Sequence, residues 1–414
     1  KETPAANFYD GLGALKGVDI TAASMGFKII NTRGFNSTSP VRTLQVIDGV
    51  DNQSPGLNFS LGNFAGANEL DVLSVDIIQG ASGAAYGPGA FNGVISMQTK
   101  DPFLYQGLDV MVKGGERELF ETNVRYAKAF KDKNGKDRFA FKVNASYMRA
   151  YDWEATSYEP TDDSDFDADN PGGYDAINIY GDEYIRIGDF SDIGLRDNFP
   201  ALGQFYRTGY REVDLVDYNT RNVKLDGQAH LKINDDTRII YGGMYSTGTT
   251  VYQGDNRYSL KDLEFYQHRL ELEGSNWFIR TYMTGEDAGK SYDAVFAGLI
   301  LQDMAKSDVV FGNAYRNWWT LEAVPALRDL PDFPDLNGNP TGSESAAALQ
   351  SFYIRNQELI HSLHDQARAH ANGEIENPLS GEVLGEARLE PGTQAFQDSF
   401  NTVISRAAFN EGGA

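Results

Sequence analysis

The chain has 414 residues, a formal net charge of −23 at pH 7 and no cysteine. The acidic balance disfavours a nucleic-acid-binding protein, because such proteins present a basic face to phosphates. The lack of thiols excludes a disulfide framework and Cys-ligated zinc. No run of about 18 apolar residues is present, so the sequence predicts no transmembrane helix. This absence does not exclude a membrane β-barrel, because the strands of such a barrel are short and alternate in polarity.

Residues 1–103 are rich in Gly and Ala and carry short apolar runs, which indicate a mixed α/β domain. In it, β-favouring runs at 75–78 and 94–97 flank a segment of small residues at 80–93. A phosphate cradle there would need Gly-Lys-Ser/Thr or a Gly-rich turn that opens a helix, and Pro88 would interrupt a helix. A flexible linker is disfavoured by the apolar runs on both sides. Close backbone packing between two strands is the third reading, and it suits glycine best.

From about residue 106 the pattern changes to a period of two, which is typical of strands with two different faces. The clearest segments are 139–147 and 223–233, and five weaker ones lie at 106–113, 119–129, 238–252, 263–273 and 276–285. In a membrane barrel, we expect the apolar positions to face lipid: Phe139, Phe141, Val143, Leu225 and Leu231. The alternate positions should then face the lumen: Lys224, Asp226, His230 and Lys232.

The connections between these segments differ in length at the two ends. Tight turns are expected at 131–137, 234–237 and 273–276, and Asn134-Gly135 in the first is a strong hairpin signal. The long connections are 152–220 and 287–414. Both follow strands that run in the opposite direction to the strands that precede the tight turns. Short turns at one rim and long loops at the other are typical of outer-membrane barrels, although a soluble β-sandwich also shows alternation.

The two long segments contain three features of their own. Asp163, Asp165, Asp167 and Asp169 alternate in an acidic stretch, where oxygen ligands could hold Ca²⁺, but the EF-hand pattern is incomplete and a solvated loop is the plainer reading. Trp318 and Trp319 could contact a ligand or partner, or form the core of a folded loop. Residues 343–371 predict a helix capped by Ser343 and Gly373, with His361 and His364 read as surface histidines. Aromatic residues throughout both segments predict folded structure.

Three motifs in the N-terminal domain resemble the plug of the TonB-dependent outer-membrane receptors: "NTRGFNS" (31–37), "LQVIDGVDNQ" (44–53) and "VDIIQGASGAAYGPGAFNGVISMQTK" (75–100). The resemblance implies a plug at 1–103 inside an antiparallel membrane β-barrel, of which 104–414 is the N-terminal part. Only about seven strands are present, against about 22 in the full protein. The matching positions are implied to be structural: Arg33, Gly34, Phe35, Asp48, Gly49, Gly80, Tyr86, Gly87, Asn92 and Gly93.

The resemblance also implies a function. It indicates a transporter rather than an enzyme, which imports a large or scarce solute across the outer membrane of a Gram-negative bacterium, with no cofactor. The expected partners are outer-membrane lipid, a periplasmic energy-coupling protein, and a surface lipoprotein or other subunit on the extracellular loops. Nothing before Phe8 resembles the coupling segment of the family, so we expect it upstream of Lys1 or absent. A structural or docking subunit of an outer-membrane complex is the alternative.

Overall fold

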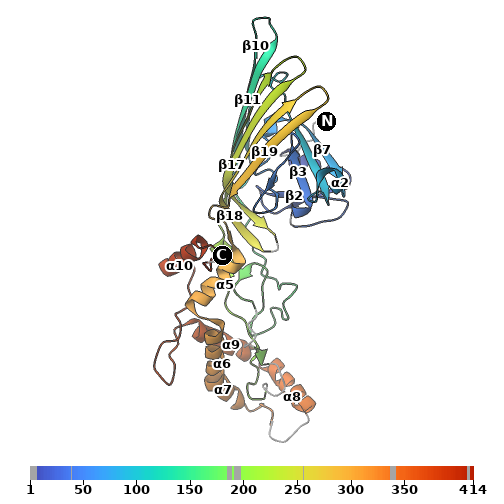
Figure 1. Cartoon of the computed structure of the whole chain (residues 1–414). Coiled ribbons are helices and arrows are strands. Elements are labelled where there is room, and N and C mark those ends of the chain that lie inside the picture. Colours follow the sequence, from blue (N-terminus) through green and yellow to red (C-terminus); the bar gives the residue numbers. More distant parts are fainter. Residues whose placement is uncertain are drawn as a thin grey trace. The chain divides into compact units, whose positions relative to one another are not determined.

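The computed structural model describes residues 7–38, 40–183, 189–190, 197–254, 256–335, 342–407 and 411–414, with the backbone alone at 342–345. The chain divides into two compact units. The first comprises Lys1–Trp153 and Asp217–Asp293, and the second comprises Glu154–Val216 and Ala294–Ala414. The first unit holds the N-terminal domain and all the long strands, whereas the second is mainly helical (Figure 1).

The long strands of the first unit form an antiparallel meander in which each strand pairs with its neighbour in sequence. They are β9 (Gly107–Gly114), β10 (Phe120–Lys131), β11 (Asp137–Tyr151), β16 (Asn219–Lys232), β17 (Arg238–Gln253), β18 (Arg257–Glu273) and β19 (Phe278–Asp287). A short strand, β20 (Tyr292–Asp293), also pairs with β18. All seven predicted strands are confirmed, as is the partial barrel that they form.

The two faces of this sheet have opposite polarity, as the alternation predicts. The outward residues are exposed or half-buried and point away from the N-terminal domain: Phe139, Phe141, Val143, Leu225 and Leu231. The inward residues are at least half-buried: Lys224, Asp226, His230 and Lys232. The Lys224 Nζ donates to the Asn63 carbonyl of the N-terminal domain at 3.1 Å, and the Lys232 ammonium lies over the Phe103 ring. The predicted inward side is therefore confirmed.

The N-terminal domain is built on a four-stranded sheet of order β4-β3-β8-β7. Its strands are β3 (Thr43–Ile47), β4 (Val50–Asp51), β7 (Val72–Gln79) and β8 (Gly93–Thr99). Two-stranded sheets β1 (Val18–Ala22)/β2 (Lys28–Thr32) and β5 (Gln53–Ser54)/β6 (Phe59–Ser60) complete the domain with helices α1 (Phe8–Leu12), η1 (Pro40–Arg42) and η2 (Glu69–Asp71). The predicted strands at 75–79 and 94–98 are confirmed as the antiparallel pair β7–β8. A core that includes Tyr9, Ile30, Ile47 and Met97 holds these elements together.

The glycine-rich segment is a turn between β7 and β8 that contains one short helix, α2 (Gly83–Tyr86). A Cβ on Gly93 would lie 2.9 Å from the Ile78 carbonyl oxygen, and a Cβ on Gly80 would collide with the Arg33 guanidinium. Both glycines also have positive φ, at 156° and 82°. The close packing predicted here is therefore within the domain, between its own segments, and not against the strands of the barrel.

The second unit has an apolar core of its own, which includes Phe205, Phe311, Tyr315, Trp319 and Phe352. Its helices are α4 (Glu212–Leu215), α5 (Ala294–Ala305), α6 (Asp308–Trp318), the π-helical η4 (Trp319–Ala323), α7 (Val324–Arg328), α8 (Gly342–Arg355), α9 (Gln357–Asn372) and α10 (Gln394–Ser405). Short strand pairs β12 (Ile179–Tyr180)/β15 (Tyr210–Arg211) and β13 (Asp189–Phe190)/β14 (Gly203–Gln204) lie in the first long segment. The predicted folding of both long segments is confirmed, and they fold together.

The single helix predicted at 343–371 is wrong in its continuity. It consists of α8 and α9, which break at Asn356 (φ −111°, ψ 22°). The Asn356 side chain donates to the Phe352 carbonyl at 3.0 Å, a local bond that competes with the helical pattern. The helix begins at Gly342, so Ser343 is not its cap, whereas the cap at Gly373 is confirmed. None of the helices in the described ranges is long and apolar enough to cross a membrane.

Candidate functional site

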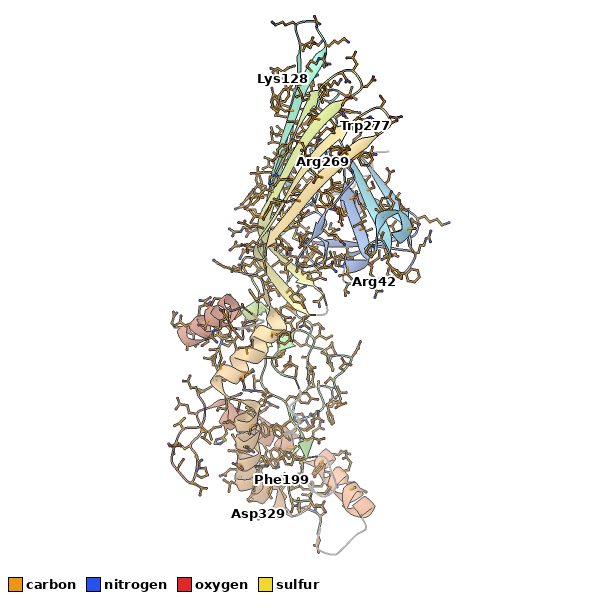
Figure 2. All side chains as sticks on the ribbon, viewed as in Figure 1. Arg42, Lys128, Phe199, Arg269, Trp277 and Asp329 are labelled. Atoms are coloured by element: carbon orange, nitrogen blue, oxygen red, sulfur yellow. The ribbon has the colours of Figure 1, made fainter. Side chains whose placement is uncertain are left out.

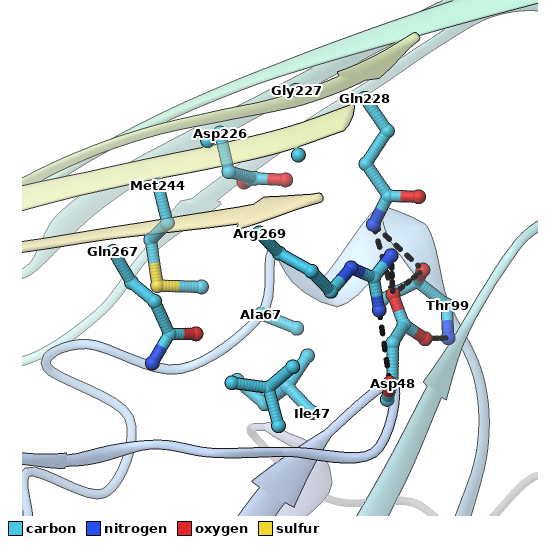
Figure 3. Close-up of a pocket in the computed structure, with 13 residues that line it drawn as sticks. Ile47, Asp48, Ala67, Thr99, Asp226, Gly227, Gln228, Met244, Gln267 and Arg269 are labelled. Carbon is cyan, nitrogen blue, oxygen red and sulfur yellow. Dashed lines mark hydrogen bonds and ion pairs between the residues drawn. The ribbon is translucent and has the colours of Figure 1, made fainter. Parts of the chain in front are cut away.

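The turn between β3 and β4 joins the N-terminal domain to the strands. Asp48 and Gly49 have φ of 49° and 78°, which is the type I′ geometry that an Asp-Gly pair favours. The Asp48 carboxylate accepts hydrogen bonds from the Thr99 backbone N–H at 2.8 Å and from the Gln228 side chain of β16 at 2.8 Å. The Arg269 guanidinium of β18 donates to the Asp48 carbonyl at 2.9 Å (Figure 3). The turn thus bonds to two barrel strands at once.

Burial alone would raise the pKa of the Asp48 carboxyl. The Arg269 and Lys142 charges and the Thr99 hydrogen bonds outweigh burial and hold this pKa below its usual value. The carboxylate is therefore ionised at neutral pH and acts as a fixed negative charge. Beside it lies a small cavity of about 50 Å³ between Ile47, Asp226 and Met244, which is large enough for water (Figure 3).

A buried ion cluster forms a second contact. Asp71 of the N-terminal domain lies 2.8 Å from the Arg125 Nε atom of β10 and 2.7 Å from the Lys142 Nζ atom of β11. All three side chains are 1% exposed. Removing one member of such a cluster leaves buried charge without compensation, which costs about 3–5 kcal/mol. The cluster therefore contributes strongly to holding the domain against the strands.

The third contact is apolar and lies at the end of the strands that leads to the long loops. Phe27, Phe59 and Phe64 pack with Tyr252, Leu263 and Phe265 of β17 and β18. Two polar contacts border it: the Ser24 hydroxyl lies 3.0 Å from that of Thr250, and Asp152 accepts from the Met25 N–H at 3.0 Å. The interface is thus apolar toward the loop end and polar toward the tight turns.

The residues that the motifs singled out divide into two groups. Asp48 and Gly49 contact the barrel strands, and the Gly49 carbonyl accepts from Arg280 at 2.8 Å. The others lie within the domain, in the 31–35 segment and in the glycine-rich turn with its flanks: Arg33, Gly34, Phe35, Gly80, Tyr86, Gly87, Asn92 and Gly93. The buried Asn92 side chain links them, because it donates to the Asn31 side chain at 3.0 Å and to the Phe35 carbonyl at 3.1 Å. Asn92 therefore fixes the 31–35 segment against the glycine-rich turn.

Sequence reasoning missed the ion cluster and the Arg269 contact. The alternation places Arg125 of β10, Lys142 of β11 and Arg269 of β18 on the inward face. A cation on that face needs an anionic or carbonyl partner, so the pattern did indicate that partners exist. Nothing in the sequence identified Asp71 as that partner, because Asp71 lies 54 positions before Arg125 and 71 positions before Lys142 in the chain.

Trp319 is fully buried in the core of the second unit, and its indole N–H donates to the Pro200 carbonyl at 3.1 Å. It is therefore a core residue and not a ligand contact, and Trp318 packs beside the same core, partly buried. His364 is also buried, contrary to the surface position expected. Its Nδ1 lies 2.8 Å from the Tyr315 hydroxyl, and its Nε2 lies 2.9 Å from the Ala201 carbonyl oxygen.

The structure does not gather the predicted Ca²⁺ ligands. Across the part of the chain that the structure describes, no group of three or more His, Cys, Asp or Glu side chains is arranged to hold a metal ion. Asp163, Asp165, Asp167 and Asp169 lie in a loop and are exposed. Asp167 instead accepts a hydrogen bond from the Asp169 N–H at 3.0 Å, which is a local turn.

Comparison with known proteins identifies the N-terminal domain. Residues 1–94 match the model of the TonB-dependent receptor plug domain. No curated protein sequence matches the chain. Similar solved structures include the siderophore receptor PirA of Acinetobacter baumannii, with 15% identity over 68% of this chain and 38% of that one and a TM-score of 0.40. The FrpB iron transporter of Neisseria meningitidis has 12% identity over 72% of this chain and 40% of its own, with a TM-score of 0.43.

The chain thus spans about two fifths of the length of these structures. The plug match is at the N-terminus, the meander follows it directly, and plug and strands lie in one compact unit. The N-terminal domain is therefore a plug domain of the TonB-dependent receptor type, and part of a β-barrel follows it in the chain.

Proposed function

We propose that the protein imports a large or scarce solute across the outer membrane of a Gram-negative bacterium, driven by a periplasmic energy-coupling protein. In this proposal the tight turns lie on the periplasmic side and the helical unit is extracellular. The exposed faces of the strands contact lipid, and plug movement opens the path. The protein acts by transport and not by catalysis.

The observation that carries this proposal is the polarity of the plug–barrel interface. Toward the tight turns, the plug is held by hydrogen bonds and ion pairs around Asp48 and Asp71, not by a continuous apolar core. Water can replace the neutral hydrogen bonds when the plug moves, so the net free energy lost is small for each of them. The buried Asp71 cluster is the costly part of this contact, and the energy-coupling protein would have to supply the free energy that opens it. The apolar cluster around Phe27 and Tyr252 lies toward the other end and would keep the resting plug in place.

A thiol probe tests plug movement without knowledge of the solute. Ser246 is fully buried, and its hydroxyl donates to the Phe64 carbonyl of the plug at 2.5 Å. A Ser246→Cys protein should react with a small maleimide severalfold faster in energised cells than in cells treated with a protonophore. Equal rates in both would contradict energised movement of the plug.

A docking subunit of an outer-membrane complex is the second candidate. It is favoured by the helical unit, which has its own core and exceeds what a short surface loop requires. Partners of this class would be a surface lipoprotein or another outer-membrane subunit. Deleting 343–371 and isolating the protein with its partners separates the candidates: loss of a partner with unchanged thiol reactivity supports docking.

A further inference from the structure

We propose that a cleft in the helical unit binds a basic peptide segment. The cleft has a volume of about 630 Å³ and lies between the 166–171 loop and helices α8 and α9. This volume falls within the range of about 300–1,000 Å³ that is typical of ligand sites. All of its lining residues belong to the second unit. The proposal goes beyond import, since binding in this cleft needs no plug movement.

The walls of the cleft are fixed before any ligand arrives. Ala201 has φ of 62°, uncommon for a residue with a side chain, and it is held there from both sides. Its N–H donates to the Tyr353 hydroxyl at 2.8 Å, and its carbonyl oxygen lies 2.9 Å from the His364 Nε2. On the facing loop, the Asn170 side chain donates to the Gly173 carbonyl at 2.6 Å and to the Gln204 carbonyl at 3.1 Å. Because both walls are held in place, little conformational entropy is lost on binding.

The charge of the cleft favours a cation. Asp167 and Asp169 line it, and among its described lining residues there is no lysine, arginine or histidine. Both carboxylates are exposed, and neither makes an ion pair within the described ranges. Arg368 reaches the same loop at the Pro171 carbonyl, 3.3 Å away, but its ion pair is with Asp365 at 3.0 Å. The net charge of −23 for the chain further attracts cations.

The rest of the lining favours a basic group on an apolar stem. Ile354 is 67% exposed and Phe166 is 36% exposed, although both line the cleft. Arginine and lysine bury their methylene stems on such surfaces while their charged ends remain polar. The Gln350 and Gln357 side chains on the helical wall can both donate to and accept from peptide groups. These features together fit a short peptide that carries Arg or Lys beside apolar residues.

Binding can be measured on the full-length receptor purified in detergent, with three fluorescent seven-residue peptides. One contains Arg and Leu in alternation, the second has Glu in place of Arg, and the third has Gln in place of Arg. We expect the basic peptide to bind most tightly. Its affinity should fall as salt rises from about 50 to 500 mM, because salt screens exposed charges. Asp167→Asn with Asp169→Asn should weaken it about fivefold or more, and Ile354→Ser should also weaken it.

The matched control is Asp163→Asn with Asp165→Asn, which removes the same charge from the same loop at positions that do not line the cleft. This variant should change the affinity less than twofold. Equal binding of the three peptides, or equal effects of the two double variants, would overturn the proposal. Binding of a neutral oligosaccharide in the absence of peptide binding would also overturn it. Failure here leaves the thiol-probe test of plug movement unaffected, so the two proposals are tested separately.

Discussion

The Nζ atom of Lys142 lies 2.7 Å from the Oδ2 atom of Asp71, and both side chains are 1% exposed. This contact joins strand β11 to the plug, and Arg125 of β10 completes it at 2.8 Å. The plug is therefore attached to the barrel by a buried acid that faces two buried cations.

Replacing Asp71 by Asn should loosen the plug by about 3–5 kcal/mol, because Arg125 and Lys142 lose their buried counter-charge. The measured quantity is the free energy of plug release. It is obtained from the rate at which a protease cleaves the plug in detergent as denaturant is added. Asp109→Asn is the matched control: its carboxylate is 49% exposed and lies 3.5 Å from the same Arg125, so its effect should be below about 1 kcal/mol. Equal effects of the two variants would show that burial of the cluster is unimportant.

A disulfide between Ser24→Cys and Thr250→Cys should lock the plug to β17. The two hydroxyl oxygens lie 3.0 Å apart, so sulfur atoms in their places need only a small shift to reach bonding distance. No native cysteine in the 414 residues competes. The oxidised protein should resist plug proteolysis at denaturant concentrations that release the plug from the reduced protein. If the two forms release the plug together, this contact does not persist.

Trp319→Ala should destabilise the helical unit by about 3–5 kcal/mol, since a fully buried indole is removed and its bond to Pro200 is lost. The neighbouring Trp318→Ala is the control and should cost less, because Trp318 is only partly buried. Urea-induced unfolding followed by proteolysis within 294–335 measures both. A larger effect at Trp318 would contradict the packing described.

The helical unit should lose stability below pH 6.5 through His364. Burial is the main cause that lowers the pKa of this histidine to about 3; the Ala201 carbonyl opposes it only in part, and the Arg368 and His361 charges add to it. In the unfolded chain this histidine has its ordinary pKa near 6.5, so above that pH the contribution of His364 to the free energy of unfolding is fully present. It is lost by about 1.4 kcal/mol per pH unit between 6.5 and 3.

The measurement is the urea midpoint of the unit between pH 7.5 and 5, in the parent protein and in His364→Gln. The variant should show a shallower decrease toward low pH. Asp182 has a pKa raised to about 8 by burial, so its contribution falls as pH rises, in the opposite sense. The difference between the two proteins isolates His364, and parallel curves would contradict its assignment.

The strands and the plug could be predicted because their signals are local. The period of two between Phe139 and Tyr147 fixes the inward face without any knowledge of the partner. The Asp48-Gly49 pair similarly fixes its own turn. The site could not be predicted, because Asp71, Arg125 and Lys142 meet only after the strands are paired. The break at Asn356 could not be predicted for a different reason: it depends on a local side-chain bond, and the apolar stripe continues across it from one helix to the next.

The most direct test of the proposed import mechanism combines the thiol probe with the lock. In energised cells, the Ser246→Cys protein and a second protein that also carries the oxidised Ser24→Cys/Thr250→Cys disulfide are treated with the same maleimide. Plug movement predicts rapid labelling at position 246 in the first and labelling at the de-energised rate in the second. Rapid labelling of the locked protein would contradict the account, because position 246 would then open without release of the plug from β17.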